Sequence, residues 1–127
     1  MQSFTIKRNV TLNVTWVQGC GRLGDGFAET IATSQPHLRT LNLAATQITD
    51  YGLERIAENC RDLELVNLYG CNGVSRAGIE ILLSLPKLRR LNIRGIDVSK
   101  EDVDELRQMN DEQVLLYGPL QSAESIY

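Results

Sequence analysis

The sequence offers little that could bind a metal or carry out catalysis. Its 127 residues include one histidine, His37, and three cysteines, Cys20, Cys60 and Cys71. None of these has a partner at metal-ligand spacing, and we find no nucleophile–base pair and no phosphate-binding loop. Residues 19–24 contain several glycines, but an equivalent turn recurs further along the chain. We therefore expect a protein that is not an enzyme and that uses neither a cofactor nor a metal.

Long apolar segments and a strong net charge are also absent. The most apolar stretches, such as residues 79–85, are far too short to span a bilayer. The first residues are polar where a signal peptide needs its apolar segment. The net charge of −3 gives no general attraction to nucleic acid or to an anionic membrane. Because cysteines without a secretory signal are normally reduced, we expect a cytoplasmic protein. From the modest charge and the short apolar stretches we expect no nucleic-acid or membrane partner.

What the sequence does contain is an internal repeat. Residues 38–43 (LRTLNL), 63–68 (LELVNL) and 88–93 (LRRLNI) share one pattern, and each copy begins 25 residues after the one before. An earlier copy over residues 12–20 aligns with the second of these without a gap, and a partial copy follows at residues 114–118. Three copies in strict phase are very unlikely to arise by chance, so the repeat decides the architecture.

Each repeat predicts a short strand followed by a helix. Residues 41–43 alternate between apolar and polar, as in a strand with one buried face. Residues 48–57 then place apolar groups at helical spacing. Thr49, Ser75 and Ser99 occupy helix N-cap positions, the last at the start of a sequence that resembles a capping box. We predict strands near residues 13–18, 40–44, 65–69, 90–94 and 114–117, and helices near 25–34, 50–59, 76–84 and 100–109.

The repeat resembles the cysteine-containing leucine-rich repeat. The resemblance lies in the leucine–asparagine strand, in Gly70 and Cys71 after it, in the ITDYGL sequence at residues 48–53, and in the AENC sequence that ends at Cys60. It covers roughly residues 12–118. It implies an α/β leucine-rich-repeat solenoid, a short right-handed horseshoe with a parallel sheet on the concave side and helices on the convex side. Departures from the pattern are Trp16 in the asparagine slot, Gln35 and Leu85 in the Cys60 slot, and Ile96 in the Cys71 slot.

A single leucine-rich-repeat domain over residues 1–127 is the expected organisation. Within it we expect a cap segment at 1–11, about four and a half repeats at 12–118 and a tail at 119–127. Stacked strand–helix units bury each other's faces, and about four suffice for stability. Phe4 and Ile6 alternate with polar residues, so the cap segment is expected to add a strand. The last strand has an unpaired edge, which we expect the tail or another chain to cover.

The resemblance implies a binding function. The family occurs in the repeat arrays of F-box proteins and in related stand-alone arrays, and solenoids usually bind their ligands on the concave face. We therefore predict a protein–protein interaction module, or alternatively the repeat portion or a relative of an F-box-type ubiquitin-ligase substrate adaptor. Its partner is another protein. The concave-face residues expected to bind it are Trp16, Gln18, Asn42, Asn67, Tyr69, Arg90, Asn92 and Arg94.

Some of these residues have a second interpretation. The asparagines belong to the repeat motif itself, so hydrogen bonding between neighbouring amides is favoured over partner binding. Trp16, the only tryptophan, suits an interface anchor and a side chain under the cap segment equally well. Lys87, Arg89, Arg90 and Arg94 form a basic patch that is either solvated surface or, on its concave side, a site for an acidic peptide. The cysteines are expected to fill small buried positions at the turns.

Overall fold

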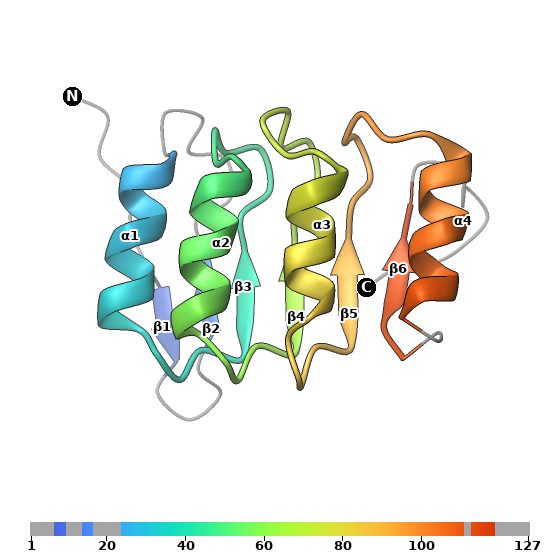
Figure 1. Ribbon diagram of the computed structural model, residues 1–127. Helices are drawn as coiled ribbons and strands as arrows, with labels where there is room; N and C mark the ends of the chain where they lie inside the picture. Colours follow the sequence, from blue (N-terminus) through green and yellow to red (C-terminus); the bar gives the residue numbers. More distant parts are fainter. Residues whose placement is uncertain (1–6, 10–13, 17–23, 111–112, 119–127) are drawn as a thin grey trace.

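The structure, a computed structural model, describes residues 24–110 and 113–118 and the backbone of residues 7–9 and 14–16 (Figure 1). The strands are β1 Lys7–Asn9, β2 Val14–Trp16, β3 Thr40–Asn42, β4 Leu65–Asn67, β5 Arg90–Asn92 and β6 Leu115–Tyr117. The helices are α1 Asp25–Ser34, α2 Asp50–Asn59, α3 Arg76–Leu83 and α4 Lys100–Met109. The predicted helices are confirmed to within one residue. The predicted strands are present too, but each is only three residues long.

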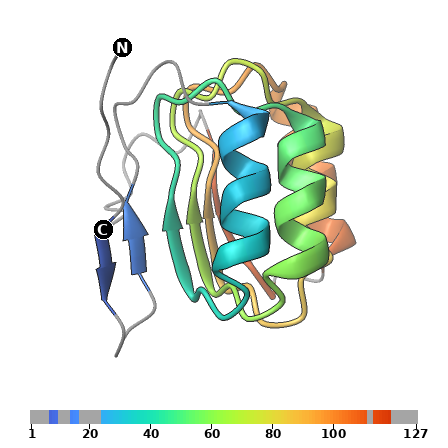
Figure 2. The same cartoon turned by 90° about the vertical axis from the view of Figure 1, so that its left-hand side faces the viewer.

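The six strands form one sheet in the order β1 to β6. β1 is antiparallel to β2, and β2 to β6 are parallel to one another. Leu41 pairs with Val66 and Val66 pairs with Leu91, a shift of 25 residues at each step. All four described helices lie on one face of the sheet (Figures 1 and 2). The fold is therefore α/β, with a mostly parallel sheet that helices cover on one side.

The ends of the chain were predicted to cap the sheet. β1 confirms that the N-terminal segment contributes a strand, and β6 is the last strand in the sheet order. Phe4, Ile6 and the tail at residues 119–127 lie outside the described residues. None of the helices that the structure describes is long and apolar enough to cross a bilayer.

The core lies between the sheet and the helices. Leu41, Val66 and Leu91 are buried at the centre of their strands, as the alternating pattern predicted. Leu53 and Ile56 of α2 are also buried, and they face the sheet because residues three apart lie on one side of a helix. One continuous apolar layer therefore runs through all the described units.

After β3, β4 and β5 the backbone turns through a left-handed residue. Ala45, Gly70 and Gly95 have φ angles of 60°, 71° and 79°. Glycine adopts this conformation freely, whereas alanine is strained in it. These turns begin directly after residues 44, 69 and 94, where the strands were predicted to end.

The two described cysteines fill small buried positions, as predicted, and Cys20 lies outside the described residues. The thiol of Cys60 donates to the Gln35 carbonyl at 3.3 Å, and that of Cys71 donates to the Leu43 carbonyl at 3.0 Å. Both carbonyls belong to the preceding strand–helix unit. Burial raises the pKa of the Cys60 thiol to about 11, so this group stays protonated and donates its hydrogen bond at neutral pH.

An aspartate at the start of one helix contacts the start of the next. The Asp25 carboxylate accepts a hydrogen bond from the Thr49 amide at 2.8 Å, and the Asp50 carboxylate accepts one from the Ser75 amide at 2.9 Å. The hydroxyl of each N-cap residue donates to the same carboxylate. Thr49 occupies the N-cap position of α2, as predicted. Its side chain, however, bonds Asp25 and makes no capping hydrogen bond within its own helix.

These carboxylates occupy the space where a side chain on the next helix would begin. A Cβ on Gly78 would lie 2.2 Å from Oδ1 of Asp50, and a Cβ on Gly52 would lie 2.4 Å from Oδ1 of Asp25. Both distances are far below van der Waals contact. The aspartate of one unit can therefore occupy this position only if the next unit has glycine there. We call this arrangement the Asp–Gly contact.

Replacement of a buried strand residue by a charged one should unfold the protein. Val66→Asp places an unpaired carboxylate in the core, and we expect a loss of about 4 kcal/mol or more of unfolding free energy. Leu115→Asp, in an exposed position of β6, is the matched control and should cost less than about 1 kcal/mol. Urea unfolding followed by circular dichroism measures both variants. Equal losses would contradict the assignment of Val66 to the core.

The Asp–Gly contact can be tested with alanine. Gly78→Ala should lower the unfolding free energy by about 1–2 kcal/mol, because the Asp50 carboxylate must leave Ser75. Asp50→Ala removes the same hydrogen bonds, so the double variant should lose clearly less than the sum of the two single losses. Gly26→Ala is the control. A Cβ there meets nothing within 4 Å, and the change should stabilise α1 by about 0.5–1 kcal/mol. Additive losses would show that the two residues do not interact.

Candidate functional site

The candidate site is the face of the sheet turned away from the helices, which we call the far face. Side chains alternate along a strand, so the neighbours of the buried Leu41, Val66, Leu91 and Leu116 point to this face. Its described positions are Thr40, Asn42, Ala44, Leu65, Asn67, Tyr69, Arg90, Asn92, Arg94, Leu115 and Tyr117.

The asparagines of the far face support the turns. The side-chain oxygens of Asn42, Asn67 and Asn92 accept hydrogen bonds of 2.9–3.0 Å from the backbone amides two residues further on. The structural interpretation of these residues is thus supported, but the bonds to their oxygens come from the local backbone and not from a neighbouring amide. Asn42 and Asn92 are buried and Asn67 is half-buried, so they offer a partner little side-chain surface.

Two large apolar side chains are exposed on the far face. Tyr69 follows β4 and Leu115 begins β6, and the exposed fraction is 54% for each. Leu115 pairs with Arg90 in the sheet register. Leu115 was not among the predicted site residues, although the burial of Leu116 beside it and the alternation of the strand were enough to place it here. Exposed aromatic and aliphatic side chains next to arginine are typical of protein interfaces.

The charge on the far face has one sign. Arg90 and Arg94 are the only charged residues at its described positions, and no aspartate or glutamate stands among them. Arg90 is exposed and forms no ion pair with any described residue. Lys87 of the predicted basic patch instead forms an ion pair with Asp62 at 3.0 Å. The basic patch on the far face is therefore smaller than the sequence indicated.

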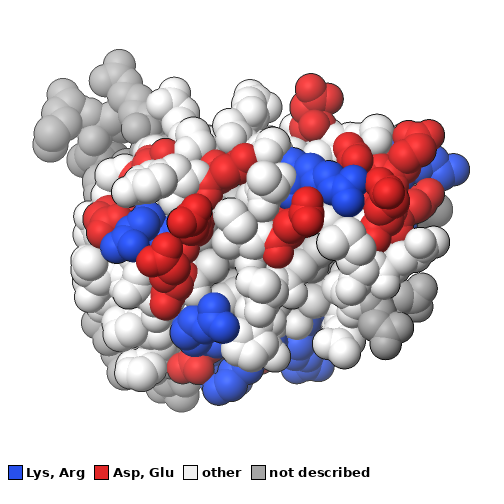
Figure 3. Space-filling model, viewed as in Figure 1, with Lys and Arg blue, Asp and Glu red and all other residues white. Residues whose placement is uncertain are grey.

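Arginines of α2 and α3 form ion pairs with carboxylates on the helical side. Figure 3 shows blue and red side chains next to each other over the helices. Arg55 of α2 bonds Glu29 of α1 at 2.8 and 3.0 Å and Glu58 at 2.7 Å. The Arg55 guanidinium holds the pKa of the Glu29 carboxyl below its usual range. This arginine thus connects two helices, and its charge is already balanced.

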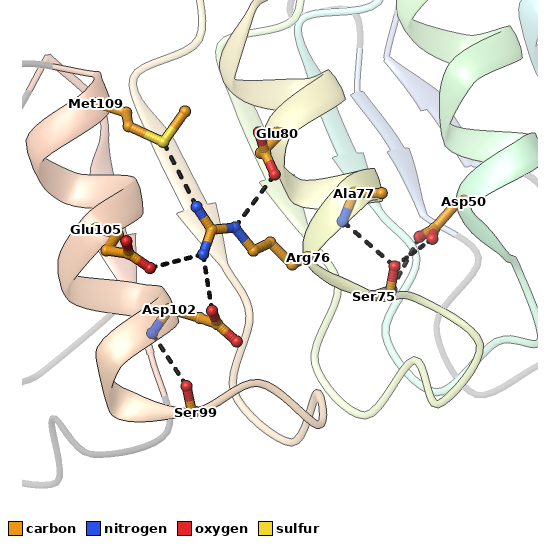
Figure 4. A network of polar contacts seen from close by, with 9 residues as sticks. All are labelled: Asp50, Ser75, Arg76, Ala77, Glu80, Ser99, Asp102, Glu105 and Met109. Atoms are coloured by element: carbon orange, nitrogen blue, oxygen red, sulfur yellow. Dashed lines mark hydrogen bonds and ion pairs between the residues drawn. The ribbon is translucent and has the colours of Figure 1, made fainter.

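A second network joins α3 to α4 (Figure 4). The Arg76 guanidinium donates to Asp102 at 2.7 Å and to Glu105 at 2.8 Å, both on α4, and to Glu80 at 3.2 Å on its own helix. Arg76 stands at the first position of α3, where α1 and α2 have aspartate, and Asp102 stands at the third position of α4, where α2 and α3 have glycine. The Asp–Gly contact is replaced here by an Arg–Asp ion pair.

The helices are spaced more widely where the Arg76–Asp102 ion pair replaces the Asp–Gly contact. α1 to α3 pack closely side by side, whereas α3 and α4 are farther apart (Figure 1). The Ser99 hydroxyl accepts a hydrogen bond from the Asp102 amide at 3.0 Å, as the predicted capping box requires. Arg76 therefore bridges a wider gap and has a structural role, like Arg55.

Two predicted site residues fall outside this description. The backbone of Trp16 pairs with Asn42, which confirms that it occupies the asparagine slot of its repeat. Its side chain and the whole of Gln18 lie outside the described residues. No group of three or more histidine, cysteine, aspartate or glutamate side chains in the described part of the chain is placed to hold a metal ion.

No protein-family model matches the chain, and no curated protein matches it.

The Arg76–Asp102 ion pair should make stability depend on pH. The Arg76 guanidinium, and next the Ser99 hydrogen bonds, hold the pKa of Asp102 below its ordinary value, whereas burial opposes this. A carboxyl with a lowered folded-state pKa stabilises the protein above its unfolded pKa of about 4, and this stability is lost as pH falls through the folded value.

Arg76→Gln should therefore weaken the fall in unfolding free energy between about pH 5 and pH 3. Lys100→Gln removes one positive charge from an exposed α4 position with no ion pair to a described residue, and it should leave the fall unchanged. Urea titrations across this pH range measure both variants. The same pH slope in Arg76→Gln and in the unchanged protein would rule out a contribution from the pair.

Proposed function

We propose that the chain is a leucine-rich-repeat solenoid that serves as a protein–protein interaction module and binds its partner on the far face. The solenoid assignment is supported by the 25-residue register, the left-handed turns, and the buried cysteines bonded to the preceding unit. In such a stack the sheet lines the concave side and the helices the convex side.

One observation carries the choice of face. Arg55 and Arg76 on the helical side are balanced by carboxylates, whereas Arg90 on the far face is exposed and forms no ion pair with a described residue. Tyr69 and Leu115 lie on the same face with half of their surface exposed. Arg90 pairs in the register with Leu65 on one side and Leu115 on the other, and arginine and tyrosine are both enriched at interfaces. No contact within the described fold requires Arg90 to be an arginine.

A rigid platform suits this role. The far-face positions belong to strands held on one side by the core and to turns held by asparagine. The backbone of such a frame is already fixed before a partner arrives, so binding has to order only the exposed side chains. The module is thus proposed to act by presenting a fixed surface, without chemistry of its own.

Charge reversal on the far face should abolish partner capture. Arg90→Glu combined with Arg94→Glu changes the potential of the face without touching the core, so the partner should be lost and the circular dichroism spectrum retained. Affinity purification from the native source with the tagged chain, followed by mass spectrometry, measures the loss.

The matched control for this purification is Arg89→Glu combined with Lys100→Glu. It makes the same change in net charge at exposed positions outside the far face, and it should retain the partner. Loss of the partner with this control alone would move the site to the helical side. Recovery of ubiquitin-ligase core subunits with the unchanged chain would instead favour an adaptor of the F-box type.

A further inference from the structure

We propose that Arg107 closes the outer edge of β6 and so prevents a second copy of this chain from adding a strand there. This inference goes beyond the proposed function and does not depend on it. It rests on the backbone groups that β6 turns outward, on the side chains that bond them, and on the position of Arg107 in the repeat.

β6 is the last strand in the sheet order, at one end of the sheet (Figure 1). The Leu115 amide donates to the Arg89 carbonyl at 2.8 Å. The Tyr117 carbonyl accepts from the Ile93 amide at 2.9 Å. These two residues of β6 therefore bond toward β5. The amide and carbonyl of Leu116, which lies between them, point outward, and such groups at a sheet edge can pair with another chain.

Two side chains from the end of α4 bond this edge. Arg107 donates through Nη2 to the Leu116 carbonyl at 2.8 Å, and Asp104, one turn earlier on the helix, lies 3.8 Å from the same guanidinium. The Asn110 side-chain oxygen accepts from the Val114 amide at 3.3 Å. The outward carbonyl of β6 is thus bonded to a charged donor, and such hydrogen bonds are stronger than those between neutral backbone groups.

Arg107 stands at a position that is apolar in the other three described helices. The eighth residue is Ala32 in α1, Ala57 in α2, Leu83 in α3 and Arg107 in α4. Ala32 and Ala57 are buried, and Leu83 is packed against the core. Each of these three has another described helix beyond it in the stack (Figure 1). In α4 the same position carries a side chain that is long enough to reach the strand edge.

A contact between two copies through β6 would need the bonded carbonyl. A twofold contact brings the same surface of both copies together, so Leu116 would face its equivalent and exchange both backbone hydrogen bonds with it. The Leu116 amide donates to no described residue. Its carbonyl is bonded to Arg107 in each copy, and pairing would bring the two guanidinium groups to one contact, where like charges repel.

Arg107→Leu tests the proposal, because it gives α4 the residue that α3 has at this position. In sedimentation velocity of the full chain, its mean mass should rise with concentration above that of the unchanged chain, toward twice its value. Arg107→Ala, with the residue of α1 and α2, repeats the test in case leucine disturbs the fold, which circular dichroism checks. Lys100→Leu is the matched control. It makes the same change at an exposed position of α4 that has no described bond to β6, and its mass should not rise.

Hydrogen exchange locates the contact. The Leu116 amide should exchange rapidly in the unchanged chain and about tenfold or more slowly in the associated variant, because it then donates to the second copy. Variants of Arg107 that do not associate, or that associate with unchanged exchange at Leu116, would overturn the proposal. So would equal association of Lys100→Leu, or slow exchange at Leu116 in the unchanged chain. Loss of the folded spectrum in both Arg107 variants would show instead that the arginine is needed for folding, and the proposed role would be wrong.

Discussion

Every strand–helix unit depends on its neighbours to bury its flanks. A three-residue strand and one helix cannot enclose a core, so each unit has to meet the next in the same register. The pairing of Leu41 with Val66 and of Val66 with Leu91 is that constraint in its simplest form. The buried thiol of Cys71, bonded to a carbonyl of the preceding unit, is a consequence of it. An extra residue within a strand would shift its buried side chains out of register with the neighbouring strands.

The sequence predicted the structure well where neighbouring units pack in the same way, and poorly where the contacts between units change. Apolar spacing predicted the helices, the central strand residues and the cysteine positions, because burial repeats with the same period as the chain. The Arg76–Asp102 pair was not predicted, since it joins residues 26 positions apart that look like ordinary surface charges. Nor did the pattern show that the Thr49 hydroxyl donates to the Asp25 carboxylate instead of capping its own helix. The sequence did contain one signal for this contact, since aspartate and glycine recur at matching positions in successive repeats.

The candidate site was predictable in outline for a related reason. Alternation along a strand fixes which side chains leave the core, so Tyr69 and Arg90 could be placed from the sequence alone. The sequence alone could not show which of these charges lack an ion-pair partner, because the partners come from other repeats. Lys87 looked like part of a basic patch, but Asp62 lies 25 residues earlier and pairs with it. Leu115 was missed, although the partial last repeat puts it in register with Arg90 and so on the same face.

The charges that join the helices are separate from those on the far face, and this affects how the surface can change. Arg55 and Arg76 each contact two or more carboxylates, so their replacement disturbs the packing of the helices. Arg90 contributes no described ion pair, and its neighbours in the register, Leu65 and Leu115, are not part of the buried core. Substitutions there alter what the face attracts at little cost in stability. The repeat therefore fixes the frame through the core and the helical ion pairs, and it leaves exposed far-face positions such as Arg90 open to substitution, on the face where we propose that a partner binds.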